Sequence, residues 1–210
     1  MKKTLLLLIC LSVQSCNAQT SFDLAEIRYE ITTEETRAIL FTLAHDDMKG
    51  RDTNSGGFYK ATAFVTNYFE THGIQPFYPA YRDSLVTDSL TAYNLVGRIG
   101  DYDPNRKTIL LGAHLDHIGI KDVEGDQIFN GANDNATGST AVLQIARFLA
   151  QHQWKQNIVV ALFADEEKGL KGAYHLAERM KNEKVELAYM VNFEMIGSTL
   201  TTGENQVYIT

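Results

Sequence analysis

Two stretches in the first half of the chain carry apolar residues at helical spacing. In the first, Thr32 and Glu35 have the spacing of a capping box and precede an apolar run at 38–44. The second is an apolar stripe at i, i+3, i+4, i+7 and i+8, made of Ala61, Phe64, Val65, Tyr68 and Phe69. Gly73 is a natural stop for this second helix. The proline-containing segment 74–92 predicts irregular structure or an excursion at a sheet edge.

From residue 93 onward, short apolar runs alternate with amphipathic stretches. The predicted strands are 94–99, 108–112, 158–163, 188–193 and 206–209, and the predicted helices are 137–151 and 168–181. The run at 158–163 is apolar at every position, which is typical of a central strand covered on both faces. Strands that alternate with helices predict an α/β domain with a largely parallel sheet.

Composition and charge narrow the function classes. The 210 residues are 44% hydrophobic and 21% charged, a globular balance with room for one large domain or two small ones. Acidic residues outnumber basic ones by 26 to 19, the formal net charge is −7, and no basic run stands out. A nucleic-acid partner is therefore not expected, because phosphate binding requires clustered lysine and arginine.

The first 18 residues have the layout of a bacterial secretory signal. Lys2 and Lys3 precede an apolar run at 5–11, which is too short to span a membrane, and small or polar residues follow. Two cleavage sites compete: a lipoprotein site that leaves Cys16 as the lipidated first residue, and an ordinary signal-peptidase site after Ala18. A buried N-terminal helix is the remaining alternative. We expect an exported protein of the bacterial periplasm or cell envelope; if the lipoprotein site is used, the lipid on Cys16 is its only attachment to the membrane.

Four polar clusters stand at or after the ends of predicted strands or in the loops between them. They are His-Leu-Asp at 114–116, Asn-Asp-Asn at 133–135, Asp-Glu-Glu at 165–167 and Asn-Phe-Glu at 192–194. In parallel sheets, binding loops gather at the carboxyl ends of the strands. Taken singly, each cluster has an ordinary explanation: an incidental polar pair, a helix N-cap, a solvated charge run or an exposed strand end. Together they supply an imidazole and several carboxylates, which is a mixed N/O ligand set for a metal ion.

Metal-activated water is the chemistry that remains when other hydrolytic sites are excluded. Both cysteines, Cys10 and Cys16, lie in the signal segment, so the mature chain has neither a disulfide nor a thiol nucleophile. No Gly-x-Ser-x-Gly elbow and no glycine-rich phosphate loop is present in the sequence. The adjacent carboxylates at 165–167 repel one another unless a cation or a shared proton intervenes. One glutamate on a metal beside another serving as general base would resolve that conflict.

The motifs around these clusters resemble those of a known family. They are Ala-His-Leu-Asp-His-Ile-Gly at 113–119, Gly-Ala-Asn-Asp-Asn-Ala-Thr-Gly at 131–138, Asp-Glu-Glu at 165–167 with Gly169 and Gly172, and Asn-Phe-Glu-Met-Ile-Gly at 192–197. In this order and spacing they are similar to the signatures of metallopeptidase family twenty-eight. This family comprises the co-catalytic zinc aminopeptidases of clan MH, relatives of glutamate carboxypeptidase II and glutaminyl cyclase. The resemblance extends over about residues 33–210 and includes the lead-in Asp-Met-Lys-Gly-Arg at 47–51.

The resemblance implies a fold, a metal centre and a set of roles. The fold would be a three-layer α/β/α sandwich of the phosphorylase/hydrolase type, with a central mixed, largely parallel sheet and two zinc ions. The implied ligands are His114 and Glu194 on one zinc, Glu167 on the other, and Asp134 bridging both. Glu166 would be the general base, and Asp116 would orient His114. The resemblance also suggests a cis peptide bond between Asp134 and Asn135.

Two features depart from the family pattern. The family often has aspartate where this chain has Glu194, and its last ligand is a histidine further downstream, whereas no histidine follows His175. We therefore expect a catalytic domain at 93–210 that is incomplete at its C-terminal end, with a helical lead-in of the same domain at 19–92. The second zinc would then have only Glu167 and the shared aspartate as ligands. His117 lies close to His114 in the sequence, and it could contact the metal ligands without itself binding the metal.

The sequence thus predicts an exported zinc-dependent exopeptidase, most simply an aminopeptidase, that hydrolyses N-terminal bonds of peptides or proteins. Two alternatives use the same fold: acyl transfer of the glutaminyl-cyclase kind, and a non-catalytic binding ectodomain. The pair Glu166 and Glu167 and the pair Asp134 and Asn135 favour the peptidase over the cyclase. Four of the five expected ligands are present, which argues against the ectodomain. The sequence indicates no oligomeric state.

Overall fold

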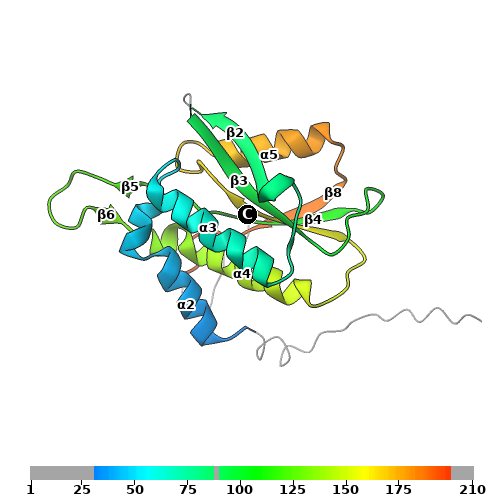
Figure 1. The fold of residues 1–210 in the computed structure, drawn as a ribbon, viewed down its shortest axis with the longest axis horizontal. Helices are drawn as coiled ribbons and strands as arrows, with labels where there is room; N and C mark the ends of the chain where they lie inside the picture. The colour runs from blue at the N-terminus through cyan, green and yellow to red at the C-terminus, as the bar shows by residue number, and fades with distance from the viewer. Residues whose placement is uncertain (1–30, 88–89, 200–210) are drawn as a thin grey trace, which may run out of the picture.

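The computed structural model describes residues 31–87 and 90–199 (Figure 1). The predicted export signal and the predicted strand at 206–209 lie outside the described residues. None of the described helices combines the length and the hydropathy that crossing a membrane requires.

A mixed sheet forms the middle layer of the described part. Its strands are β1 (Gln75–Pro76), β2 (Arg82–Thr87), β3 (Leu90–Ile99), β4 (Thr108–His114), β7 (Asn157–Phe163) and β8 (Leu187–Asn192). The strand order is β1-β3-β7-β4-β8, and β2 also pairs with β3. β7, β4 and β8 run parallel, whereas β3 is antiparallel to β7, β1 and β2. A separate two-stranded ribbon joins β5 (Gly119–Ile120) to β6 (Ile128–Phe129).

The central strand β7 is buried at every position because both of its faces are covered. Ile158, Val160 and Leu162 pack into one hydrophobic core with residues of α3 (Gly56–Thr71) and α4 (Thr137–Ala150). Val159, Ala161 and Phe163 pack into a second core with residues of α5 (Lys171–Asn182). Successive residues of a strand point to opposite faces, so one apolar run supplies both cores. The helices accordingly lie on both faces of the sheet (Figure 1), which confirms the predicted fold class.

Side-chain caps begin the helices of the first half. Thr32 Oγ1 accepts the N–H of Glu35 at 3.2 Å and begins α2 (Thr33–Leu43). The carboxylate of Glu35 pairs with Arg147 of α4 at 2.9 Å and thereby ties α2 to α4. At α3, Ser55 Oγ accepts the N–H of Phe58, and Gly73 follows the last turn with a φ of +71°. The stop at this glycine agrees with the prediction.

The segment 74–92 is an edge excursion of the sheet, and it is more regular than its prolines suggest. β2 pairs with β3 along its whole length, from Arg82 opposite Leu95 onward. The buried Asp83 on β2 accepts hydrogen bonds from Asn94 Nδ2 at 2.8 Å and from Arg179 Nη1 at 2.9 Å. A strand held by a buried carboxylate lacks the apolar alternation that marks strands in a sequence.

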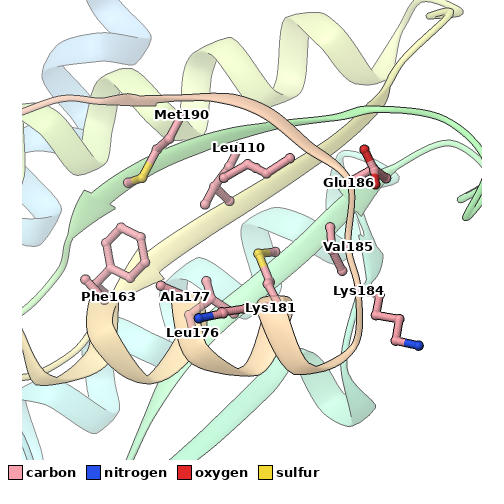
Figure 2. A pocket seen from close by; sticks show the side chains of 12 residues that line it. Leu110, Phe163, Leu176, Ala177, Lys181, Lys184, Val185, Glu186 and Met190 are labelled. Atoms are coloured by element: carbon pink, nitrogen blue, oxygen red, sulfur yellow. The ribbon is translucent and has the colours of Figure 1, made fainter.

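The apolar strand β8 is exposed on the edge of the described sheet. Its exposed apolar side chains are Leu187, Tyr189, Met190 and Val191. A cavity of about 420 Å³ lies between α5 and the β4–β8 half of the sheet. Figure 2 shows Leu110, Phe163 and Met190 at this cavity from the sheet, with Leu176 facing them from α5. This half of the α5 layer is therefore packed less completely than the half over β3 and β7.

Candidate metal centre

The three parallel strands end at the same edge of the sheet. β4 ends at His114, opposite Phe163 at the end of β7, and β8 ends at Asn192, opposite Gly112 of β4. The short helical turn η3 (Ala132–Ala136) leads from the same edge into α4. The polar clusters that follow these elements are consequently close in space.

Two sets of potential ligand atoms share one aspartate. His114 Nε2 lies 3.1 Å from Asp134 Oδ1 and 3.0 Å from Glu194 Oε1. His117 Nδ1 lies 2.6 Å from Glu167 Oε1 and 3.8 Å from Asp134 Oδ2. Within each set, the ligand atoms all lie within 4.8 Å of one another. We call the two sets the His114 cluster and the His117 cluster.

Asp134 connects the clusters because its two carboxylate oxygens face different imidazoles. Oδ1 is buried and accepts no hydrogen bond from the described residues, although His114 is adjacent. The peptide bond between Asp134 and Asn135 is cis, as the family resemblance suggests. A buried carboxylate oxygen without a donor is a group that a cation would satisfy.

The charges around His114 also favour a cation. Burial lowers the pKa of His114, but the Asp116 and Glu194 carboxylates outweigh burial and raise that pKa to about 10. Positive charge is therefore stabilised where the carboxylates of Asp134 and Glu194 converge on the imidazole. Imidazole and carboxylate groups are ligands of catalytic zinc, so the residues present fit the metal that the resemblance implies.

Asp116 is buried and holds two parts of the centre together. Its main-chain oxygen lies 3.0 Å from His114 Nδ1, whereas its carboxylate Oδ1 is 3.7 Å from that nitrogen. The carboxylate accepts the backbone N–H groups of Glu166 at 3.2 Å and Glu167 at 3.4 Å. Asp116 therefore contacts His114 mainly through its carbonyl, and it positions the two glutamates through its side chain.

Glu166 lines a cavity of about 250 Å³ beside His114 and Glu194. Much of the remaining wall is apolar and consists of Phe163, Leu170, Ala173 and Met190. Burial raises the pKa of Glu166, and the neighbouring carboxylates raise it further against the opposing effect of His114. A carboxylate with a raised pKa accepts a proton more readily near neutral pH.

The segment that carries both clusters matches a known protein family. Residues 94–204, more than half of the chain, match the model of peptidase family M28. The chain belongs to this family. The matched segment contains every residue of the His114 and His117 clusters. The resemblance seen in the sequence motifs is thereby confirmed.

Curated proteins related to this M28 chain are named as a zinc metalloprotease or as an aminopeptidase. It is 36% identical to a protein of Pyrenophora teres described as a probable zinc metalloprotease, over 48% of this chain and 20% of that protein. It is 34% identical to an aminopeptidase of Pseudomonas aeruginosa, over 54% of this chain and 20% of that protein. The chain thus spans about a fifth of the length of these curated relatives.

Solved structures share the fold at low sequence identity. The LapA aminopeptidase of Legionella pneumophila superposes with a TM-score of 0.68 at 21% identity, over 86% of this chain and 50% of that one. The glutaminyl cyclase of Porphyromonas gingivalis superposes with a TM-score of 0.64 at 16% identity, over 80% of this chain and 62% of that one. Both likenesses concern the fold alone.

The M28 centre rests on a buried arginine that lies outside the matched segment. Arg51 Nε donates to Leu115 O at 2.8 Å, Nη1 donates to Leu43 O and Asn130 O at 2.6 Å each, and Nη2 donates to Gly131 O at 2.9 Å. Its side chain thus joins the loop after β4 to the turn that carries the shared aspartate. Burial lowers the pKa of Arg51 to about 10, although the carboxylates of the site oppose this shift, so the guanidinium is charged at neutral pH.

Asn135 is the second buried support, and it joins η3 to the end of β8. Its Nδ2 donates to Phe193 O at 2.9 Å and to Glu194 Oε2 at 3.3 Å. Its Oδ1 accepts the N–H groups of Gly138 at 3.0 Å and Met195 at 3.2 Å. The side chain therefore places Glu194 beside the shared aspartate.

The sequence motifs contain Arg51, Asn135 and His117, yet motif analysis does not assign the first two a role. Most of their partners are main-chain atoms, many of them in segments far away in the sequence, and such partners leave no mark in a residue pattern. For His117, the spacing of three residues from His114 is a signal, but only the fold brings its ring to Glu167.

Replacing Arg51 by alanine should destabilise the chain by about 3–5 kcal/mol, because four carbonyl oxygens lose their donor and buried carboxylates lose a counter-charge. Urea unfolding measures this directly. Arg37→Ala, on the exposed side of α2, is the matched control and should change stability by no more than about 0.5 kcal/mol. Equal unfolding midpoints for the two variants would show that Arg51 does not hold the centre together.

Proposed function

We propose that the chain carries the metal centre of a zinc-dependent exopeptidase, in the simplest case an aminopeptidase. Two clusters of imidazole and carboxylate that share Asp134, with Glu166 at an adjoining cavity, are the observation that carries this proposal. The names of the relatives from Pseudomonas aeruginosa and Pyrenophora teres support it. The activity of the whole protein is inferred, since the chain matches only part of those relatives.

The residues of the centre divide the work of peptide hydrolysis. The metal ligands in this proposal are His114, Asp134 and Glu194 on one side, with Asp134 and Glu167 on the other. A zinc ion held by these residues would supply Lewis acidity, which would lower the pKa of a water molecule and polarise a peptide carbonyl. Glu166 takes a proton from the attacking water and gives it to the departing amine. Asp116 holds Glu166 in place through the backbone N–H.

The glutaminyl-cyclase alternative is supported by the fold likeness to the Porphyromonas gingivalis enzyme. That likeness does not distinguish the two activities, because the aminopeptidase LapA superposes at least as well. The adjacent Glu166 and Glu167 favour hydrolysis, because one can accept a proton from water while its neighbour binds metal. The apolar cavity wall beside Glu166 suits an apolar substrate group better than the amide of a glutaminyl residue.

An activity comparison separates these two functions. With zinc supplied, the full chain should release arylamine from amino-acid arylamides and should form no pyroglutamate from N-terminal glutaminyl peptides. Both reactions are followed in parallel, with a chelator as the zero-metal reference. Pyroglutamate formation without arylamine release would replace the peptidase by the cyclase.

Two neighbouring glutamates provide a matched pair of variants. Glu166→Gln should lower kcat by roughly 10²–10⁴-fold with nearly unchanged zinc content, because it removes a proton acceptor and no ligand. Glu167→Gln should release zinc first, because it removes a ligand. Metal analysis and steady-state kinetics on both variants check the assignment. Near-normal turnover in Glu166→Gln would assign the general base to another group.

We further propose that the protein is exported and carries a lipid on Cys16, on the basis of the basic, apolar and small-residue layout of residues 1–18. In a bacterial host, the parent and the control Cys10→Ala should fractionate with membranes, whereas Cys16→Ala should not. Soluble periplasmic protein in all three cases would favour the ordinary cleavage site after Ala18. Cytoplasmic retention of all three would contradict export.

A further inference from the structure

We propose that His117 is a metal ligand, through Nδ1, at the second position of the centre. This inference deepens the proposed function, because it rests on the same metal centre and assigns that centre a residue beyond the implied set. It also replaces the expectation that the second position has carboxylate ligands alone. In its place, each position receives one imidazole, one glutamate and a share of Asp134.

The geometry of the His117 cluster is close to that of a zinc site. With Zn–N and Zn–O distances of about 2.0–2.2 Å, neighbouring ligand atoms of a tetrahedral site lie about 3.3 Å apart. The distances from His117 Nδ1 to Glu167 Oε1 and Asp134 Oδ2, 2.6 Å and 3.8 Å, lie on either side of this value. Small movements of the side chains would equalise them. The imidazole is also largely shielded from solvent, with 12% of its side chain exposed.

The backbone leaves a space that the His117 ring fills. Gly131 has a φ of +59°, and a Cβ at this position would lie 2.6 Å from His117 Cδ2 and Cγ. A larger residue at 131 would therefore collide with this ring and with the main-chain oxygen of Asp134, which lies 2.3 Å from that Cβ. The carbonyl of Gly131 is held by Arg51 Nη2, and the backbone N–H of His117 approaches the carbonyl of Arg51 at 3.4 Å. The ring is thus placed by the same support that places the aspartate loop.

The chemistry of the donor set favours a ligand role over a hydrogen bond alone. Catalytic zinc sites usually have three protein ligands that include at least one imidazole. Asp134 and Glu167 supply two, and His117 Nδ1 is the nitrogen that completes the set among the described residues. A hydrogen bond from Nδ1–H to Glu167 is the competing role, in which His117 would only orient the glutamate.

Cobalt(II) titration of the full chain, followed by visible absorption and by metal analysis, tests this inference. We expect two ions per chain in the parent. Loss of a residue that merely orients a ligand costs about 10–100-fold in metal affinity, so His117→Ala should weaken the second ion by more than about 100-fold. The first ion should be retained. His45→Ala is the matched control, because its exposed side chain pairs with Asp47 of its own turn, and it should bind both ions normally.

Two further variants separate ligation from hydrogen bonding. Aspartate can ligate a metal but cannot donate to Glu167, whereas glutamine can donate but is a poor ligand. His117→Asp should therefore keep more of the second-site affinity than His117→Gln. The reverse order, or a loss of second-site affinity of about 100-fold or less in His117→Ala, overturns the inference. A parent chain that binds a single ion also overturns the inference, if Glu194→Gln releases that ion and His117→Ala retains it. A parent that binds no cobalt or zinc contradicts the proposed function itself.

Discussion

The parallel pairing of β4 with both β7 and β8 is the constraint on which the whole site depends. It places the ends of three strands at one edge, so that His114, Glu167 and Glu194 emerge as neighbours. In an antiparallel meander, successive strand ends alternate between opposite edges. The seven residues of β4 extend over about 23 Å, a separation that no metal–ligand contact can bridge. The crossover helices α4 and α5 are therefore as necessary to the chemistry as the ligands.

Gathering carboxylates at one edge carries an electrostatic cost, and the structure offsets it with fixed donors. The backbone N–H groups of Glu166 and Glu167 satisfy Asp116, and the amide of Asn135 reaches Glu194. The guanidinium of Arg51 adds a full positive charge beneath these groups. At Asp134 Oδ1 no described donor fills this role, which distinguishes the ligand position from its supports.

Much of this architecture could be predicted from the sequence because it depends on apolar runs. The run at 158–163 predicted the central strand, and the strand ends predicted where the polar clusters meet. β2 could not be predicted with the same ease, because the buried carboxylate of Asp83 interrupts its alternation. Motifs indicated His114, Asp134 and Glu167, but the proximity of His117 to Glu167 depends on how two loops fold over a glycine. Contacts between a side chain and distant carbonyls, as at Arg51, have no sequence pattern at all.

The position of Arg51 in the chain has a consequence for modularity. The segment recognised as M28 begins at residue 94, yet the guanidinium that joins its loops comes from 43 residues earlier. The unit that a family comparison recognises is thus smaller than the unit that can hold its own active edge in shape. A graft or an excised domain that begins at residue 94 would contain the ligands of the metal centre but would lack Arg51. In this chain, the segment that matches the family model is shorter than the segment needed to keep the metal-binding loops in place.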